Sequence, residues 1–249
     1  MAFNDNTYIR PDTVTLYANT NETFLNGQVK GIILELPGLG GGSCMGGSMD
    51  RQEYSAPHAK NFAENGIVLA YLFPGPWSWG NRGAVRIADA VVAALAEKYG
   101  LGKEFPLLVS GGSMGGQGAL MYAAETRYSL CGVAVACPCT DIPALFYVRP
   151  EFPRTFISAV AGYDMPLEEA LQQISPINRV NDMQDTAYYI CSNSADELIP
   201  EIQIDTFTEA LQNRGISVTY RRQPDTFHGQ FLPEVWDEMH RFMLERVLA

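Results

Sequence analysis

The chain has 249 residues, of which 47% are hydrophobic and 18% are charged, and its formal net charge is −11. A chain of this length can bury a core without the help of disulfides or metals. Its excess of acidic residues disfavours binding to nucleic acids and to anionic lipid surfaces, both of which rely on basic clusters. We therefore expect one globular domain over residues 1–249, with neither nucleic-acid nor membrane partners.

The first half of the chain alternates short apolar runs with helical patterns. In chain order, the sequence predicts a strand over 14–18, a turn over 19–22, a strand over 31–36, a helix over 55–65, a strand over 67–73 and a helix over 84–99. Ser55 is the expected N-cap of the first helix, and Gly66 and Gly100 are expected to follow the ends of the two helices.

The second half continues the alternation but contains one long interruption. The sequence predicts strands over 107–110, 132–137, 187–192 and 218–222, and helices over 113–125, 200–214 and 232–248. Strands that are apolar throughout and separated by helices indicate a mainly parallel sheet with helices on both faces, so the fold class is α/β. Residues 138–184 are rich in proline and aromatic residues and show no clear strand, which predicts a cap inserted between two strands.

The cysteine pattern bears on metal binding and on compartment. The chain has five cysteines, which are Cys44, Cys131, Cys137, Cys139 and Cys191. They form no C-x-x-C pair, and no histidine lies at metal-ligand spacing from them, so we expect buried thiols, no metal site and a cytoplasmic location. Residues 1–6 are polar, which predicts no signal peptide, although a leader removed before residue 1 would leave the same sequence.

Ser113 is the candidate nucleophile. It lies in the pattern G-x-S-x-G, with Gly111 and Gly115 at the outer positions. The short pattern is weak alone, but an apolar strand leads into it and a helical pattern leads out, as in a nucleophile elbow. Larger side chains at the two glycines would clash with the adjacent strand and helix. The alternatives are a glycine-rich packing turn and a phosphate loop, although neither common phosphate-loop pattern occurs.

A serine nucleophile needs a neighbouring base. Of the three histidines, His228 is the one that lies on a predicted loop, between the last strand and the last helix. We therefore expect His228 to be the base. His58 lies in the first predicted helix, well upstream, and His240 lies within the last predicted helix, where a surface or packing role is expected.

The base in turn needs a carboxylate that orients it. Asp196 follows the penultimate predicted strand and is the expected partner of His228. Glu197 and Asp225 are the alternatives, and Asp196 could instead serve only as an acidic residue at a helix N-terminus.

Acyl transfer also needs hydrogen-bond donors for the oxyanion. We expect the backbone N–H of Met114 as one donor and that of Leu39 as the other, with Gly40 as the second choice. Leu39 lies in the glycine-rich loop 36–43, whose glycines allow the backbone to approach a substrate closely. A flexible surface linker is the alternative for this loop.

The chain order Ser113, Asp196, His228, with each residue after a predicted strand, resembles that of the α/β-hydrolase superfamily. Within it, the chain is most similar to prolyl oligopeptidase-like and dienelactone hydrolase-like proteins. The segments that carry this similarity are Ser175-Pro176-Ile177, 196–200 and Phe227-His228-Gly229, together with 73–81 where those proteins have an arginine- and glycine-rich loop. The resemblance runs from about residue 31 to residue 249 and implies an α/β-hydrolase fold.

Three positions depart from these families. Pro37-Gly38 stands where many esterases have His-Gly, and Gly112 fills a position that is often larger. Dienelactone hydrolases use a cysteine nucleophile where this chain has Ser113, a difference that favours ester hydrolysis.

The cap and the loop before the second predicted helix are rich in aromatic residues. We expect the cap to cover the Ser113 edge, with an apolar substrate pocket lined by Trp77, Trp79, Phe146 and Phe156, joined by Tyr147, Phe152 and Tyr163. Ordinary packing is the alternative for each. Arg82, Arg149 and Arg154 are interpreted as surface charges rather than as a clamp for a carboxylate.

These observations predict a serine hydrolase that acts on small-molecule carboxylic esters through an acyl-enzyme, with no metal and no cofactor. One alternative is a serine peptidase acting on short peptides. The other is a non-catalytic binding protein that keeps the hydrolase core. The oligomeric state and the acyl and alcohol groups of the substrate stay open.

Overall fold

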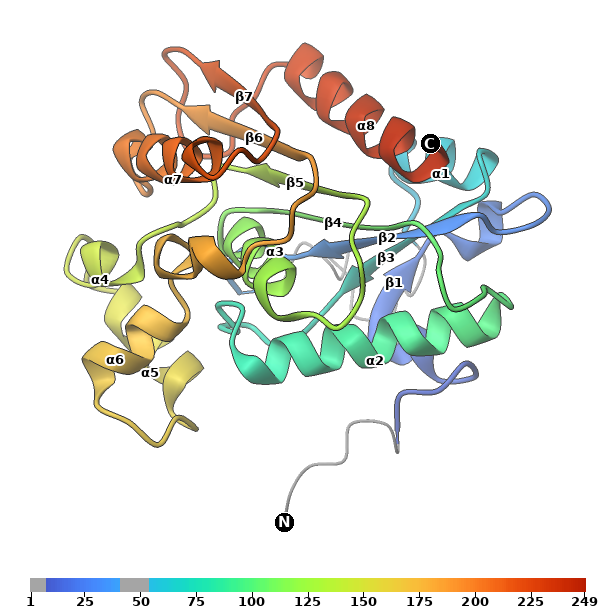
Figure 1. Cartoon of the computed structure of the whole chain (residues 1–249), viewed down its shortest axis with the longest axis horizontal. Coiled ribbons are helices and arrows are strands. Elements are labelled where there is room, and N and C mark those ends of the chain that lie inside the picture. Colours follow the sequence, from blue (N-terminus) through green and yellow to red (C-terminus); the bar gives the residue numbers. More distant parts are fainter. Residues whose placement is uncertain (1–7, 41–53) are drawn as a thin grey trace.

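The structure, a computed structural model, describes residues 8–40 and 54–249. In these ranges a seven-stranded sheet has the order β1-β3-β2-β4-β5-β6-β7, with β1 antiparallel to β3 and the other neighbours parallel (Figure 1). The strands are β1 (Ala18–Thr20), β2 (Gly31–Leu36), β3 (Ile67–Leu72), β4 (Leu107–Gly112), β5 (Gly132–Ala136), β6 (Tyr188–Asn193) and β7 (Val218–Gln223). The predicted α/β class with a mainly parallel sheet is confirmed.

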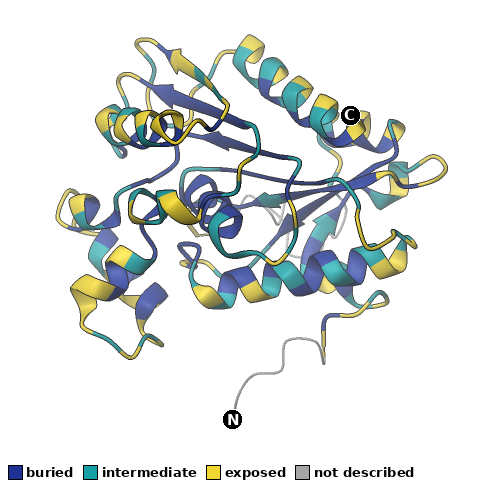
Figure 2. Ribbon diagram, viewed as in Figure 1, coloured by how far each residue is buried: buried dark blue, intermediate teal, exposed yellow. Residues whose placement is uncertain are grey.

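Helices cover both faces of this sheet. They are α1 (Pro57–Glu64), α2 (Arg82–Lys98), α3 (Met114–Glu125), α4 (Ile142–Leu145), α5 (Phe152–Val160), α6 (Leu167–Gln173), α7 (Glu201–Asn213) and α8 (Pro233–Leu248). Successive residues of a strand point to opposite faces, so Leu107 and Val109 share one apolar core with α2, α3 and α7, while Leu108 joins a second core with α1 and α8. The central strands are almost wholly buried between these layers (Figure 2).

Two local predictions near the N-terminus are wrong. Residues Val14–Leu16 form a 3-10 helix, and the strand begins only at Ala18, the last residue of the predicted strand, and continues to Thr20, inside the predicted turn. Local bonds from the Leu16 and Tyr17 N–H groups to Thr13 and Val14 carbonyls take the place of sheet bonds. The first long helix begins at Pro57, whose fixed φ suits a first turn, and Ser55 is not its N-cap.

Helices α4, α5 and α6 occupy the segment 138–184 that the sequence predicts to be a cap. Three side-chain hydrogen bonds tie this segment to the core. They run from Trp79 Nε1 to Thr155 Oγ1 (3.0 Å), from Asn81 Nδ2 to the Ala159 carbonyl (2.8 Å) and from Gln117 Nε2 to the Ile174 carbonyl (2.6 Å). The segment is therefore anchored on α3 and on the loop before α2. Its role as a cap over the Ser113 edge stays a prediction.

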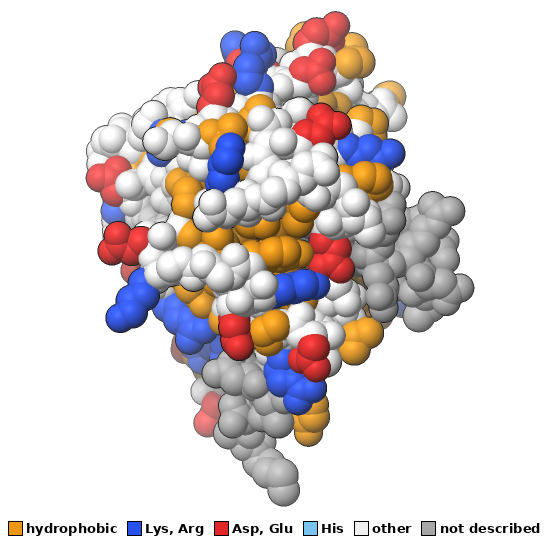
Figure 3. All heavy atoms as spheres, turned by 90° about the vertical axis from the view of Figure 1, so that its right-hand side faces the viewer, with side chains coloured by type: hydrophobic (Ala, Val, Ile, Leu, Met, Phe, Trp, Pro, Cys, Tyr) orange, Lys and Arg blue, Asp and Glu red, His pale blue; other side chains and the backbone are white. Residues whose placement is uncertain are grey.

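The remaining features of the fold are the side chains on its surface and the composition of its helices. On the face drawn in Figure 3, acidic and basic side chains are interspersed around a central apolar area. Within the described ranges, none of the helices combines the length and the apolar character needed to cross a membrane. Residues 1–6, residues 41–43 of the predicted oxyanion loop, and Cys44 lie outside the described residues.

Candidate active site

The turn between β4 and α3 holds Ser113 in an unusual backbone conformation. Its φ of 57° and ψ of −124° lie in a region that non-glycine residues rarely adopt. The Ser113 N–H donates to the Ala136 carbonyl at 2.9 Å, which fixes the turn against the end of β5. The chain thus enters α3 directly after a strained serine, as a nucleophile elbow requires.

Glycine is needed at the two outer positions of the motif. A Cβ at Gly115 would lie 2.0 Å from the Leu36 carbonyl oxygen, and one at Gly111 would lie 2.5 Å from the Gly115 backbone. These contacts are with backbone atoms, which cannot turn aside, and they confirm the predicted clashes. A Cβ at Gly112 would meet nothing closer than 3.7 Å, so that position tolerates a larger residue.

The structure brings the three predicted residues into one hydrogen-bonded line. His228 Nε2 lies 2.9 Å from Ser113 Oγ, and His228 Nδ1 lies 2.7 Å from Asp196 Oδ2. Ser113 follows β4, Asp196 follows β6 and His228 follows β7. The carboxyl ends of parallel strands share one edge of a sheet, so residues that lie 115 and 32 positions apart in the chain meet there.

Asp196 is buried and uses both carboxylate oxygens. Its side chain is 1% exposed, Oδ2 faces His228, and Oδ1 accepts the N–H groups of Leu198 and Ile199 at 2.8 Å each. Both N–H groups belong to the loop before α7, which begins at Glu201 with Pro200 as its N-cap, so Asp196 does not cap that helix. This double engagement fixes the direction of Oδ2.

The other two acids near His228 do different work. Glu197 Oε2 accepts the backbone N–H of His228 at 3.1 Å and so holds the loop rather than the ring. Asp225 has a φ of 54° and donates its own N–H to Ser194 Oγ, which makes it a turn residue.

Asn193, the last residue of β6, was not predicted to matter. Its Oδ1 accepts the Gly229 N–H at 3.0 Å, and its Nδ2 donates to Thr226 Oγ1 at 2.8 Å. The side chain therefore clamps the loop on both sides of His228. Asn193 is fully buried, and buried polar groups require partners. The signal available in the sequence was its place directly after the strand predicted over 187–192.

Opposing effects act on the charge of His228. Burial disfavours the imidazolium, but the hydrogen bond with Asp196 and the neighbouring Cys137 sulfur outweigh it and raise the pKa of His228 above its ordinary value. The His228 side chain is 14% exposed, so solvent reaches it only in part. An imidazole in this setting accepts a proton readily and stabilises the cation that results.

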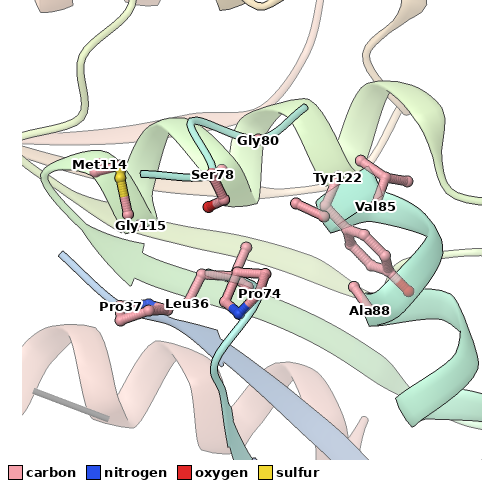
Figure 4. Close-up of a pocket in the computed structure, with 12 residues that line it drawn as sticks. Leu36, Pro37, Pro74, Ser78, Gly80, Val85, Ala88, Met114, Gly115 and Tyr122 are labelled. Atoms are coloured by element: carbon pink, nitrogen blue, oxygen red, sulfur yellow. The ribbon is translucent and has the colours of Figure 1, made fainter. Parts of the chain in front are cut away.

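The two predicted oxyanion donors lie on segments that face each other. Figure 4 shows Met114 and Gly115 at the start of α3 opposite Leu36 and Pro37 at the end of β2. Within the described residues, the N–H groups of Met114 and Leu39 have no hydrogen-bond partner, whereas the Gly40 N–H donates to the Pro76 carbonyl at 2.8 Å. Met114 and Leu39 therefore have free donors, and Gly40, the second choice, does not.

A small apolar cavity lies beside the elbow and is distinct from a substrate pocket. It is lined by residues of β2, α2 and α3 and of the loop before α2, including Leu36, Pro74, Val85 and Met114 (Figure 4). Its free volume of about 10 Å³ offers at most the room of one water. The elbow is therefore closely packed on this side, and the cavity is too small for an organic substrate.

The aromatic residues predicted to line a substrate pocket divide into two groups. Trp79 and Phe156 are 1% and 0% exposed, and their ring centroids lie 4.5 Å apart, so they pack α5 on the core rather than line an open pocket. Phe146 is 8% exposed and also contacts Phe156. Trp77 and Tyr147 are 39% and 89% exposed, and both remain candidates that solvent can reach.

The remaining histidines form a separate pair between α1 and α8. The rings of His58 and His240 stack at 4.3 Å, and His58 Nε2 lies 3.1 Å from Tyr54 OH. Burial lowers the pKa of both to about 4, and the neighbouring His240 adds to the effect on His58. Both are thus neutral near pH 7. They line a cavity of about 800 Å³ together with Glu35, whose pKa burial raises to about 7.

Comparison with known proteins identifies the family. The family model described as the prolyl oligopeptidase family matches residues 78–245, a range that includes Ser113, Asp196 and His228. The chain belongs to the prolyl oligopeptidase family. The expected resemblance is thereby confirmed, and the chain is a member of a family of serine hydrolases.

The individual relatives differ in how much of their own length this chain covers and in the activity that their names state. Dipeptidyl peptidase family member 6 from Caenorhabditis elegans is 28% identical over 207 residues, which cover 80% of this chain and 27% of that protein. The chain thus spans about a quarter of this curated relative. A puromycin-hydrolyzing peptidase from Mycobacterium tuberculosis matches with a TM-score of 0.70 and 16% identity, over 89% of this chain and 34% of the other.

Esterase B from Lactobacillus rhamnosis matches with a TM-score of 0.65 and 12% identity, over 89% of this chain and 76% of the other. At such low identities the structural matches show the fold alone. They confirm the α/β-hydrolase architecture and leave the choice between esters and peptides to other arguments.

Proposed function

We propose that this protein is a serine hydrolase that cleaves carboxylic esters of small molecules through an acyl-enzyme. The observation that carries the proposal is the unbroken line from Ser113 Oγ through the His228 ring to the buried Asp196 carboxylate. A serine hydroxyl in this setting is activated as a nucleophile, and free backbone donors at Met114 and Leu39 suit a developing oxyanion.

In the first half of the proposed reaction, Ser113 Oγ attacks the acyl carbon while His228 Nε2 takes its proton. The carbonyl oxygen becomes negative and accepts the N–H groups of Met114 and Leu39. Asp196 keeps the proton of Nδ1 on the side away from Ser113 and stabilises the imidazolium. The imidazolium then returns its proton to the departing alkoxide, which leaves as the alcohol.

In the second half, a water molecule replaces the alcohol. His228 takes a proton from the water as its oxygen attacks the acyl carbon, and the oxyanion again lies at the same two N–H groups. Collapse of this intermediate releases the carboxylic acid and returns the proton to Ser113. Every proton transfer passes through Nε2, which explains why a single imidazole suffices.

A peptidase acting on short peptides is the second candidate, and the family match favours it. Amide cleavage would use the same residues, with the proton of His228 delivered to the leaving amine. Glu197, which follows Asp196 in the chain, is an acid beside this site, but its carboxylate already accepts the backbone N–H of His228. Ester hydrolysis makes no demand for a second acid that binds a free amine.

The test compares p-nitrophenyl esters with p-nitroanilides that carry the same acyl or aminoacyl group. We expect Ser113→Ala to lower ester turnover by roughly 10⁴-fold or more. Ser110 is a buried serine of β4 that lies three residues before Ser113, so Ser110→Ala is the matched control and should keep the wild-type rate. Cleavage of the anilides at a rate above that of Ser113→Ala would overturn the esterase proposal in favour of a peptidase.

A fluorophosphonate probe tests the third reading, a binding protein without activity. We expect one label per chain, on Ser113, and none in Ser113→Ala. An unlabelled wild-type chain that also hydrolyses no ester would mean that the serine is idle.

A further inference from the structure

A thiol lies beside the imidazole of the candidate active site. Cys137 Sγ is 4.0 Å from His228 Nε2, the same nitrogen that faces Ser113 Oγ at 2.9 Å. The three side chains come from three different strand ends. The proposed ester hydrolysis uses Ser113 and His228 but gives no role to Cys137.

The backbone holds Cys137 firmly in this place. Its φ is 38°, its N–H donates to the Cys191 carbonyl at 2.7 Å, and the preceding Ala136 carbonyl accepts the Ser113 N–H. The residue is 3% exposed, so the thiol has little freedom to turn away. The short distance to the imidazole is therefore a fixed feature of the fold.

These atoms have the spacing of ligands to a common ion. Zinc binds thiolate sulfur at about 2.3 Å and imidazole nitrogen at about 2.0–2.1 Å, so two such ligands lie about 3.6 Å apart in a tetrahedral site and about 4.4 Å apart at the geometric limit. The 4.0 Å separation of Sγ and Nε2 is within this reach. Ser113 Oγ lies 2.9 Å from the same nitrogen and is a third ligand atom within reach.

Asp196 has the position of an outer carboxylate in such a site. Donor atoms of Cys137, His228 and Asp196 all lie within 4.8 Å of one another. However, both oxygens of Asp196 are engaged, one of them by Nδ1 of the ring. A carboxylate behind a ligating histidine fixes the tautomer that leaves Nε2 free for a metal.

We propose that Cys137 Sγ and His228 Nε2, assisted by Ser113 Oγ, bind a thiophilic divalent cation such as Zn²⁺ and that this binding inhibits the enzyme. On binding, the thiol loses its proton to solvent and the sulfur forms a bond to the ion, while the neutral imidazole gives its Nε2 lone pair. No electron is transferred. The inhibitory effect, though not the binding itself, rests on the proposed hydrolase function, because the ion occupies the nitrogen that would accept the serine proton.

The ligand set also predicts selectivity among cations. Thiolate and imidazole prefer Zn²⁺ and similar ions, whereas Mg²⁺ and Ca²⁺ prefer oxygen ligands. We therefore expect Zn²⁺ and Cd²⁺ to bind and Mg²⁺ and Ca²⁺ to have no effect at the same concentration.

Calorimetric titration of the full chain with Zn²⁺ tests the binding directly. We expect a site with one ion per chain that releases protons, and Cys137→Ala should weaken it by about 100-fold or more. Cys131→Ala is the matched control, because burial raises the pKa of that thiol and it lies on a different loop. Unchanged affinity in Cys137→Ala, with an unchanged circular dichroism spectrum, would overturn the proposal.

Two further variants separate the metal site from the hydrolase function. Ser113→Ala should still bind Zn²⁺, since the sulfur and the nitrogen remain, whereas His228→Ala should bind at least about 10-fold more weakly. In the wild type, Zn²⁺ should stop ester turnover reversibly, and a chelator should restore it. If no ester is cleaved but the titrations behave as stated, the function proposal fails and the metal site stands; if turnover is normal and Zn²⁺ neither binds nor inhibits, the reverse holds.

Discussion

The three histidines occupy two regions of the molecule that treat the same side chain in opposite ways. At the sheet edge, His228 has a buried carboxylate behind Nδ1, and its pKa is raised despite burial. Between α1 and α8, His58 and His240 are stacked on each other, and burial lowers their pKa to about 4. Burial acts against the imidazolium in both regions, so the partner decides the outcome.

The difference shows why one histidine can act as a base and the other two cannot replace it. A base must become charged during the reaction, and among the described residues His228 is the histidine with a carboxylate in contact with its ring to stabilise that charge. The stacked pair would instead place two positive charges 4.3 Å apart in a partly buried setting. The pair is thus suited to a neutral packing role, one of the two roles expected for His240.

Removing the Asp196 carboxylate should have the largest effect on the difference between His228 and the other two histidines. In Asp196→Asn the charge behind His228 is lost, and we expect kcat for an ester to fall by roughly 10³–10⁴-fold while the fold is kept. Asp225→Asn is the matched control, since Asp225 uses its backbone in a turn and asparagine tolerates a positive φ. A wild-type rate in Asp196→Asn would remove Asp196 from the proposed mechanism.

The geometry of the sheet edge can be broken without touching any of the three side chains. Gly115→Ala places a methyl group on the Leu36 carbonyl, and we expect the free energy of unfolding to fall by roughly 3 kcal/mol or more. Gly112→Ala, one residue from the serine on its other side, should change it by less than about 1 kcal/mol. Chemical denaturation of both variants measures the difference, and equal effects would contradict the account of the elbow.

The pH dependence of turnover sharpens the comparison further. Because the pKa of His228 is raised and the base acts when deprotonated, kcat/KM should fall as the pH is lowered, with its midpoint above the ordinary imidazole value of about 6.5. His240→Phe should leave this midpoint in place, because the α1–α8 pair titrates separately. A midpoint near pH 4 would mean that a group with a lowered pKa, such as His58 or His240, controls the loss of activity at low pH instead of His228.

The stacked pair should have its own, smaller signature in stability. The unfolded chain protonates His58 and His240 below about pH 6.5, whereas the folded chain resists until about pH 4, so their contribution is present at neutral pH and is lost on acidification across that window. His240→Phe should reduce the fall in the free energy of unfolding between pH 7 and pH 5 by on the order of 1–2 kcal/mol. Denaturation at pH 7 and pH 5 measures it.

Glu35, in the same cavity, acts in the opposite direction. Burial raises the pKa of Glu35 to about 7, so the folded chain holds its proton more tightly than the unfolded chain does. This contribution to stability is complete below about pH 4.5 and is lost as the pH rises through 7. The difference between wild type and His240→Phe therefore isolates the histidine contribution, because Glu35 is present in both. An acid loss that is identical in the two proteins would mean that the imidazole at position 240 titrates normally.

The sequence by itself determined the fold class and the candidate site residues for the same physical reason. Apolar periodicity and glycine turns are local signals, and parallel strands have to bring their carboxyl ends to one edge. A residue just after a predicted strand, such as Ser113, Asp196 or His228, could therefore be assigned to that edge without coordinates. Where local signals compete, as in Val14–Leu16, the strand boundary was misplaced.

Only the tertiary structure decided which side chains touch. Cys137 is 91 positions from His228, and their approach depends on the twist and register of β5 against its neighbours. The expectation of no metal site rested on spacing along the chain, which says nothing about such a contact. The clamp by Asn193, the burial of Trp79 and the stacking of His58 on His240 likewise arise from the packing of segments that the chain itself keeps far apart.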